Sequence, residues 1–213
     1  MRKRCYRVLV FFEALGLAAY IGWYIWQLQD AHPNSWIVFP VWLAISVAAH
    51  RDAPKTLGWR SDNLWPASQR AAKVFLVFIA AICVAAAWLG AFYRRPVRLM
   101  EARHFFSYLG FCLLQQVALN SYLTNRLLDV FESRSVVALV AGIIFAALHW
   151  PNPVLVPLTL VGGFAMSWLF AKERNILPIT LGQAVLGALI CWAFPNSWHH
   201  GMRVGPGFYT FHP

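Results

Sequence analysis

The sequence predicts an all-α, polytopic transmembrane helical bundle with about seven spans. Of its 213 residues, 60% are hydrophobic and only 12% are charged, whereas a typical soluble domain is about 45–50% apolar and about 25% charged. The apolar residues also gather into runs of roughly 20, the length that a helix needs to cross the hydrocarbon core of a bilayer. The composition excludes disordered, collagen-like and ordinary soluble cytosolic proteins.

Seven such runs give the order of the expected spans, and the second and fifth are the shortest. They are residues 6–28, 34–50, 71–93, 104–131, 133–150, 152–173 and 176–194. We expect the first to be retained as a helix, because it is longer than a signal peptide core and is interrupted by Glu13. The turn Trp150-Pro151-Asn152-Pro153 is so short that the fifth and sixth spans should form an antiparallel hairpin.

Basic residues outnumber acidic ones, 18 to 8, and give a net charge of +10. With a cytoplasmic N-terminus, 13 of the 18 fall on the cytoplasmic side, as the positive-inside rule favours. The other basic residues are Arg94, Arg95, Arg98, Arg103 and Arg203. The first four of these strain the topology, so they either lie along the interface or indicate that a short span is miscounted. We expect an integral protein of the bacterial inner (plasma) membrane that contacts membrane lipids.

Several partners and chemistries find no support in the sequence. No basic stripe is interleaved with exposed aromatic residues, so we expect no nucleic acid partner. The four cysteines follow no metal or redox spacing and read as buried small hydrophobic residues. Zinc-helix, phosphate-loop, dinucleotide and serine-hydrolase motifs are missing as well. We therefore expect no metal and no cofactor.

Polar side chains inside the spans mark the candidate site, because such groups are costly at membrane depth. Interhelical hydrogen bonds are their ordinary structural use, but here three spans of the second half each carry one or more, and these can converge on one pocket. The candidates, with the aromatic residue one turn before the histidine, are Gln115, Gln116, Asn120, Phe145, His149 and Gln183.

Glu13 is the sole acid well inside a predicted span. It could carry protons or pair with a cation, which would make it functional. Alternatively, it could be a protonated carboxyl group that is hydrogen-bonded to a neighbouring helix. We favour this second, structural interpretation.

The order and spacing of these residues resemble the CAAX protease and bacteriocin-processing family, the Abi-type intramembrane glutamic endopeptidases. Members carry E-E-x-x-x-R on one helix, F-x-x-x-H on the next, and H-x-x-x-N or H-x-x-x-D near the C-terminus. Here the first motif reads Gln115-Gln116-Val-Ala-Leu-Asn120, the second is intact as Phe145 to His149, and the third reads Gln183-Ala-Val-Leu-Gly187. Leu57-Gly58-Trp59-Arg60 also resembles an element that precedes the family core.

The resemblance implies a CAAX-protease-like core over residues 105–194, within what we expect to be a single integral membrane domain over residues 1–213. It also implies a hydrolase that acts on the C-terminus of a prenylated protein, or on another lipidated or transmembrane peptide. In the family the first glutamate, helped by histidine, is thought to activate water. Gln115 and Gln116 cannot take that proton, because an amide does not titrate.

Two interpretations of the site remain. In the first, the chain is a diverged peptidase in which His149 is the base and Gln115, Gln116 and Gln183 position water and the peptide carbonyl. In the second, it is a pseudo-protease or scaffold whose uncharged pocket binds the peptide. Chemistry favours the second, because a missing general base costs about 10²–10⁴ in rate. A small transporter is less favoured, since we find no internal repeat.

Overall fold

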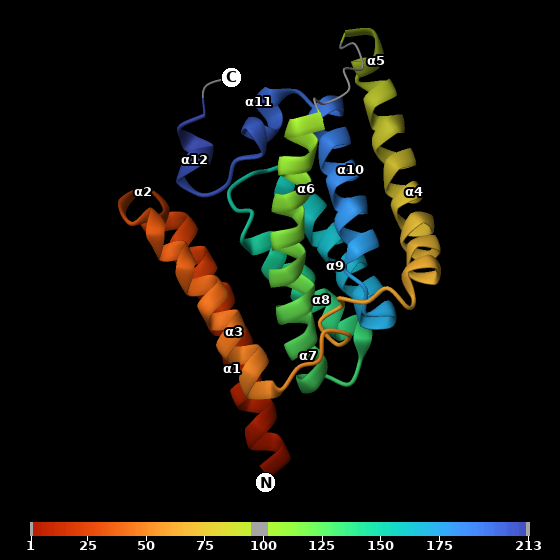
Figure 1. The fold of residues 1–213 in the computed structure, drawn as a ribbon. Helices are drawn as coiled ribbons and strands as arrows, with labels where there is room; N and C mark the ends of the chain where they lie inside the picture. The colour runs from red at the N-terminus through yellow and green to blue at the C-terminus, as the bar shows by residue number, and fades with distance from the viewer. Residues whose placement is uncertain (1, 95–101, 212–213) are drawn as a thin grey trace.

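The computed structural model describes residues 2–94 and 102–211, and all the regular elements in these ranges are helices (Figure 1). The longer ones are α1 (Arg2–Trp23), α3 (Val38–His50), α4 (Leu64–Trp88), α6 (Ala102–Gln116), α7 (Asn125–Val130), α8 (Arg134–Ala147), α9 (Leu155–Glu173) and α10 (Leu177–Ala193). The shorter ones are α2 (Gln29–Ala31), α5 (Ala91–Arg94), α11 (Asn196–His199) and α12 (Pro206–Tyr209). The predicted all-helical membrane bundle is confirmed.

The helices form a bundle in which α1 and α3 lie as a tilted pair on one side and α4 lies on the other (Figure 1). Helices α6, α8, α9 and α10 fill the space between them. Successive long helices run in alternate directions, except that α7 continues the course of α6. The N-terminus, the 51–63 loop and α7 therefore gather at one end of the bundle, and α5, α11 and α12 gather at the other.

Three helical segments in the described ranges are long and apolar enough to cross a membrane, namely Arg4–Ala31, Leu64–Trp88 and Leu155–Glu173. Helices α8 and α10 are apolar but shorter. The first segment includes a π-helical turn (Tyr24–Leu28) that joins α1 to α2. The fourth predicted span corresponds to a continuous helical run that passes from α6 through a π-helical stretch (Val117–Thr124) into α7.

The third predicted span has different ends in the structure. Helix α4 begins at Leu64 rather than Ala71, because Pro66 fits the first turn of a helix even though the surrounding residues are not uniformly apolar. It ends at Trp88, and the short helix α5 follows after Gly90. Arg95 and Arg98 of the predicted interfacial cluster lie outside the described residues.

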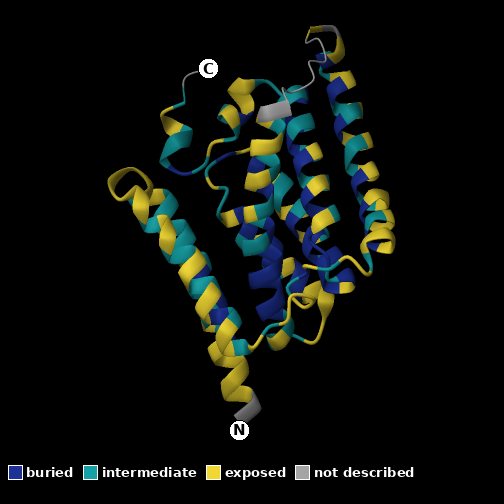
Figure 2. Cartoon of the chain, viewed as in Figure 1, coloured by how far each residue is buried: buried dark blue, intermediate teal, exposed yellow. Residues whose placement is uncertain are grey.

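Exposed residues lie along the outer faces of α1 and α4 (Figure 2). Many of them are large and apolar, as expected for helices that contact lipid. On α4, Trp88 is 89% exposed and Val77 is 69% exposed, and on α1 Phe12 is 65% exposed. A soluble protein rarely exposes such continuous apolar surface. The most buried residues lie where α7, α8 and α9 meet the inner faces of α1 and α10 (Figure 2).

Helices α8 and α9 form the antiparallel hairpin expected from the short proline-containing turn (Figure 1). Glycines allow the two backbones to approach closely. A Cβ atom added to Gly142 would lie 2.9 Å from the backbone oxygen of Leu160, and one added to Gly163 would lie 3.1 Å from the Cα of Gly142. Small residues at helix crossings are typical of membrane bundles, in which packing replaces the hydrophobic effect between helices.

Candidate functional site

Three glutamines from two helices meet inside the bundle. The side-chain amide of Gln183, on α10, donates from Nε2 to Oε1 of Gln115 at 2.5 Å. Its own Oε1 accepts from Nε2 of Gln116 at 2.6 Å. Gln115 and Gln116 are the last two residues of α6, which packs beside α10. Helix packing therefore unites amides that are 67 and 68 positions apart in the chain.

We call the hydrogen-bonded side-chain amides of Gln115, Gln183, Gln116 and Asn120 the amide chain. It continues from the glutamines into the protein interior. Nδ2 of Asn120 donates to Oε1 of Gln116, and Oγ1 of Thr124 lies 3.0 Å from Oδ1 of Asn120. The same hydroxyl lies 3.1 Å from Oγ of Ser167 on α9. Asn120 and Thr124 lie in the π-helical stretch, a geometry often found at functional sites. The result is a connected series of polar contacts among uncharged side chains, in which each of the three glutamine carbonyls accepts a donor.

His149 lies in the turn that follows α8. Its Nδ1 is 2.6 Å from the backbone oxygen of Phe145, and this nitrogen must donate because a carbonyl oxygen can only accept. The imidazole also packs edge-on against the Phe145 ring, with 4.6 Å between ring centroids. In the neutral ring the lone pair is then on Nε2. The second motif thus fixes both the tautomer and the orientation of the histidine.

A cavity of about 170 Å³ connects the histidine with the glutamines. Of the six predicted site residues, Gln115, Phe145, His149 and Gln183 line it. The other two are fully buried and lie behind this wall, where they hold the lining glutamines through the amide chain. The remaining walls are mostly aromatic and aliphatic side chains of α4, α6, α9 and α10.

The chemistry available in the cavity follows from this lining. In the described part of the chain, the side chains around it include no Asp, Glu, Lys or Arg. His149 is the lining residue whose unperturbed pKa is nearest neutrality. The amides of Gln115 and Gln183 can donate to or accept from a ligand, but neither can remove a proton from water.

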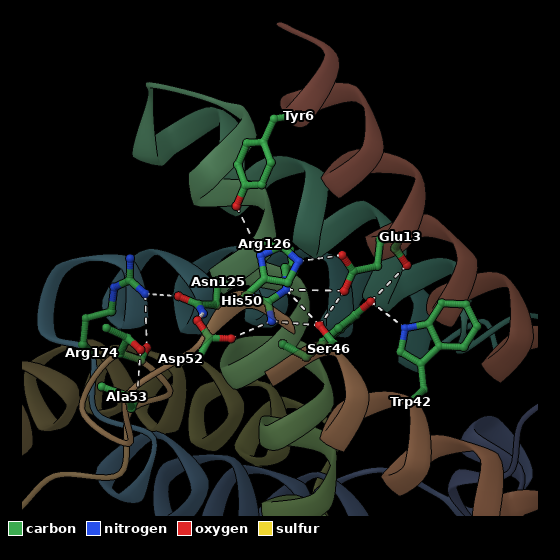
Figure 3. Close-up of polar contacts among 12 residues, drawn as sticks. Tyr6, Glu13, Trp42, Ser46, His50, Asp52, Ala53, Asn125, Arg126 and Arg174 are labelled. Carbon is green, nitrogen blue, oxygen red and sulfur yellow. Dashed lines mark hydrogen bonds and ion pairs between the residues drawn. The ribbon is translucent and has the colours of Figure 1, made fainter. Parts of the chain in front are cut away.

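A second polar cluster joins α1, α3, the 51–63 loop and α7 (Figure 3). Arg126 is only 1% exposed, and its Nη2 donates to Oδ2 of Asp52 at 2.6 Å and to Oγ of Ser46 at 2.8 Å. Its Nε lies 3.6 Å from Oε1 of Glu13. The other oxygen of Glu13 lies 2.8 Å from Nε2 of His50. The cluster therefore joins three helices and a loop through ionic groups.

This cluster corrects the interpretation of Glu13. The side chain does bond to a neighbouring helix, since Ser46 of α3 donates to it. However, it is an ion-pair partner and not a protonated carboxyl group, because the guanidinium of Arg126 and the ring of His50 both face its oxygens. Arg126 is one of the 13 basic residues counted above on the cytoplasmic side. Its neighbour Asn125 and its place in the fourth apolar run are the signals that could have revealed it.

The C-terminal segment is attached to the α8–α9 turn by Asn152, whose role was not predicted. This residue is fully buried. Its Nδ2 donates to the backbone oxygens of His199, at 2.7 Å, and of Arg203, at 3.0 Å. Its Oδ1 accepts from the backbone nitrogens of Val154 and Leu155 and so caps α9. One side chain thereby fixes both the hairpin and the chain that follows α11.

The attachment of the C-terminal segment also positions residues of the cavity wall. Gly205 donates its backbone N–H to the oxygen of Trp150 at 3.0 Å, which adds a second tie between the C-terminal segment and the turn. Met202 and Val204 are held in the wall of the cavity as a result. The C-terminal segment is therefore part of the candidate site.

The Leu57-Gly58-Trp59-Arg60 element connects the loop after α3 to the core. Ser121 donates its hydroxyl to the backbone oxygen of Leu57 at 2.6 Å, and the backbone nitrogen of Ile176 donates to the oxygen of Gly58 at 3.1 Å. Gly58 has φ = 86°, a conformation that favours glycine. The element thus anchors the loop to the π-helical stretch and to the start of α10.

Comparison with known protein families gives a match over the central part of the chain. The model of the family described as type II CAAX prenyl endopeptidase Rce1-like matches residues 72–189. This range is more than half of the chain, extends from α4 into α10 and contains all six predicted site residues. No curated protein and no solved structure gives a match.

Proposed function

The chain belongs to the Rce1-like family of type II CAAX prenyl endopeptidases, and we propose that it binds lipidated or membrane-associated peptides in its cavity without hydrolysing them. The observation that carries this proposal is the amide chain. Gln115 and Gln116, which replace the acids expected from the family resemblance, are bonded to Gln183 and Asn120 in an uncharged network. A site of this kind can hold a peptide group but cannot activate water by carboxylate chemistry.

The shape of the cavity supports a ligand with a peptide part and a hydrocarbon part. Its polar atoms belong mainly to Gln115, His149 and Gln183, and aromatic and aliphatic walls surround them. Phe111 lines the cavity and is 53% exposed, and Leu114 on the same helix is 70% exposed. The cavity wall therefore continues into the apolar outer surface of α6. A lipid-anchored peptide could enter from the membrane by this route.

A diverged peptidase is the second candidate, and one observation favours it. The bond from Nδ1 of His149 to the oxygen of Phe145 leaves Nε2 of the neutral ring able to accept a proton inside the cavity. In that case Gln115 and Gln183 would position water and the scissile carbonyl. The two candidates differ only in whether the bound peptide is cut.

Binding can be tested with a cavity-filling substitution and a matched control. Gly162 lines the cavity, and a Cβ atom added there would meet only the end of Met166, at 3.9 Å. Gly162→Leu should therefore fill the cavity and abolish binding of a fluorescent S-farnesylated tetrapeptide to the protein in liposomes. Ala80→Leu should bind normally, since Ala80 is exposed on α4 and does not line the cavity. Failure of the wild type to bind, or unchanged binding by Gly162→Leu, would contradict the proposal.

We further propose that the N-terminal end of the bundle faces the cytoplasm of a bacterial cell, in its inner membrane. The positive-inside rule supports this orientation, because Arg51, Lys55, Arg60, Arg134 and Arg174 lie in the loops and at the helix ends on that side of the bundle. Cys5 is exposed near the start of α1. It should react with a membrane-impermeant maleimide in inside-out vesicles and resist it in right-side-out vesicles. The reverse pattern would overturn the orientation.

A further inference from the structure

The hydroxyl group of Tyr108 occupies the space that a side chain at Gly187 would fill. A Cβ atom added to Gly187, on α10, would overlap the hydroxyl oxygen of Tyr108, on α6, and would lie 2.8 Å from the Cζ atom that carries it. Any side chain at position 187 would therefore displace the end of the tyrosine. The absence of a side chain at this position lets α6 place a hydroxyl group directly against the backbone of α10.

This position belongs to the candidate site. Gly187 follows Gln183 by four residues, so the two residues lie on the same face of α10. Tyr108 and Gly187 both line the cavity that contains Gln115 and Gln183. The tyrosine hydroxyl therefore adds a further polar group, beside Gln115, His149 and Gln183, to a cavity whose lining is otherwise mostly apolar.

The bonding of the hydroxyl group leaves it available to a ligand. It lies on the same face of α6 as the thiol of Cys112, four residues further along. Sulfur is a weak hydrogen-bond partner, whereas a peptide carbonyl oxygen is a strong acceptor. A peptide carbonyl is therefore a better partner for this hydroxyl than the thiol.

We propose that Tyr108 is a ligand-binding residue whose hydroxyl donates a hydrogen bond to a backbone carbonyl of the bound peptide. The amides of Gln115 and Gln183 contact the same peptide from the adjoining wall. The inference rests on the proposed function and deepens it, because it assigns recognition of the peptide part of the ligand to this group. Recognition of the hydrocarbon part is left to the apolar walls.

Two fluorescent probes separate these contributions in liposomes that contain the full chain. One is an S-farnesylated tetrapeptide, and the other is a farnesyl thioether of the same dye without a peptide. Tyr108→Phe keeps the ring and removes the hydroxyl, so it should weaken binding of the first probe by about threefold to tenfold, the usual effect of losing one neutral hydrogen bond. Binding of the second probe should not change. Gly187→Ala should shift the hydroxyl and weaken binding of the first probe as well.

Tyr209→Phe is the matched control, because Tyr209 is 64% exposed on α12 and should leave both affinities unchanged. Equal binding of the farnesylated peptide by the wild type and Tyr108→Phe would overturn the inference and leave the proposed function standing. An equal loss for both probes would also overturn it, since the hydroxyl would then only support the shape of the cavity. Failure of the wild type to bind either probe would refute the proposed function itself.

Discussion

Replacing Gln116 by glutamate should destabilise the protein much more than the same change at Gln115. The two glutamines are adjacent, but they have different roles in the amide chain. Nε2 of Gln116 donates to Oε1 of Gln183 at 2.6 Å and contacts the sulfur of Met166 at 3.0 Å. A glutamate has no hydrogen to offer there when it is ionised. Gln115 uses its Oε1 to accept from Gln183, and a carboxylate oxygen can accept the same bond.

The magnitude follows from burial and from the number of bonds lost. Gln116 is fully buried, so Gln116→Glu leaves the oxygen of Gln183 without its donor and places a second acceptor against it. An unsatisfied buried polar group costs about 1–3 kcal/mol, and more when a charge is involved. We expect a loss of at least about 2 kcal/mol, which corresponds to a fall of about 4–8 °C in the melting temperature of a chain of this size. Gln115→Glu keeps its bond and borders the cavity, so its loss should stay below about 1 kcal/mol.

Thermal unfolding in detergent, followed by the fluorescence of the 11 tryptophans, measures this difference. The wild type, Gln115→Glu and Gln116→Glu should be compared at the same scan rate, because the unfolding of membrane proteins is often irreversible. Equal falls in melting temperature for the two variants would refute the assigned roles. So would a larger fall for Gln115→Glu.

Two further substitutions test the parts of the structure that surround the site. Arg126→Ala leaves the acids of the ionic cluster without their buried partner and should lower the free energy of unfolding by about 3–5 kcal/mol. Arg134 is exposed, and Arg134→Ala should change the free energy of unfolding by less than about 0.5 kcal/mol. Similar melting temperatures for the two variants would contradict the proposed role of the ionic cluster. Asn152→Ala removes the two side-chain bonds to the C-terminal segment and leaves the bond from Gly205 to Trp150, so limited trypsin digestion in detergent should cut after Arg203 several times faster than in the wild type. An unchanged cleavage rate would show that the segment is held by other contacts.

The fold class could be predicted from the sequence because it depends on local properties. Apolar runs, the proline-containing turn and the low charge all act within a few residues of the chain, and they give the helices and the α8–α9 hairpin. The ends of helices were predicted less well. The π-helical stretch Val117–Thr124 depends on tertiary contacts, such as the bond from Ser121 to Leu57, that no local pattern records.

The candidate site was predictable where polar groups stand out in apolar runs. Gln115 and Gln183 are conspicuous for this reason, and the structure brings them into contact. Arg126 was missed because its partners are distant in sequence, with Asp52 some 74 positions away. Asn152 was missed because two of its partners are backbone oxygens, which every residue has and which residue identity therefore cannot indicate. The fit of Tyr108 against Gly187 likewise exists only once α6 and α10 have packed together.

The central claim is that the cavity binds a peptide and does not cut it. The most direct measurement is mass spectrometry of an S-farnesylated tetrapeptide after incubation with the wild type and with His149→Ala in liposomes. We expect the wild type to retain the peptide at its intact mass, with no fragments above those of empty liposomes. Fragments that appear with the wild type and disappear with His149→Ala would contradict the claim and show that His149 supports hydrolysis in place of the missing acid.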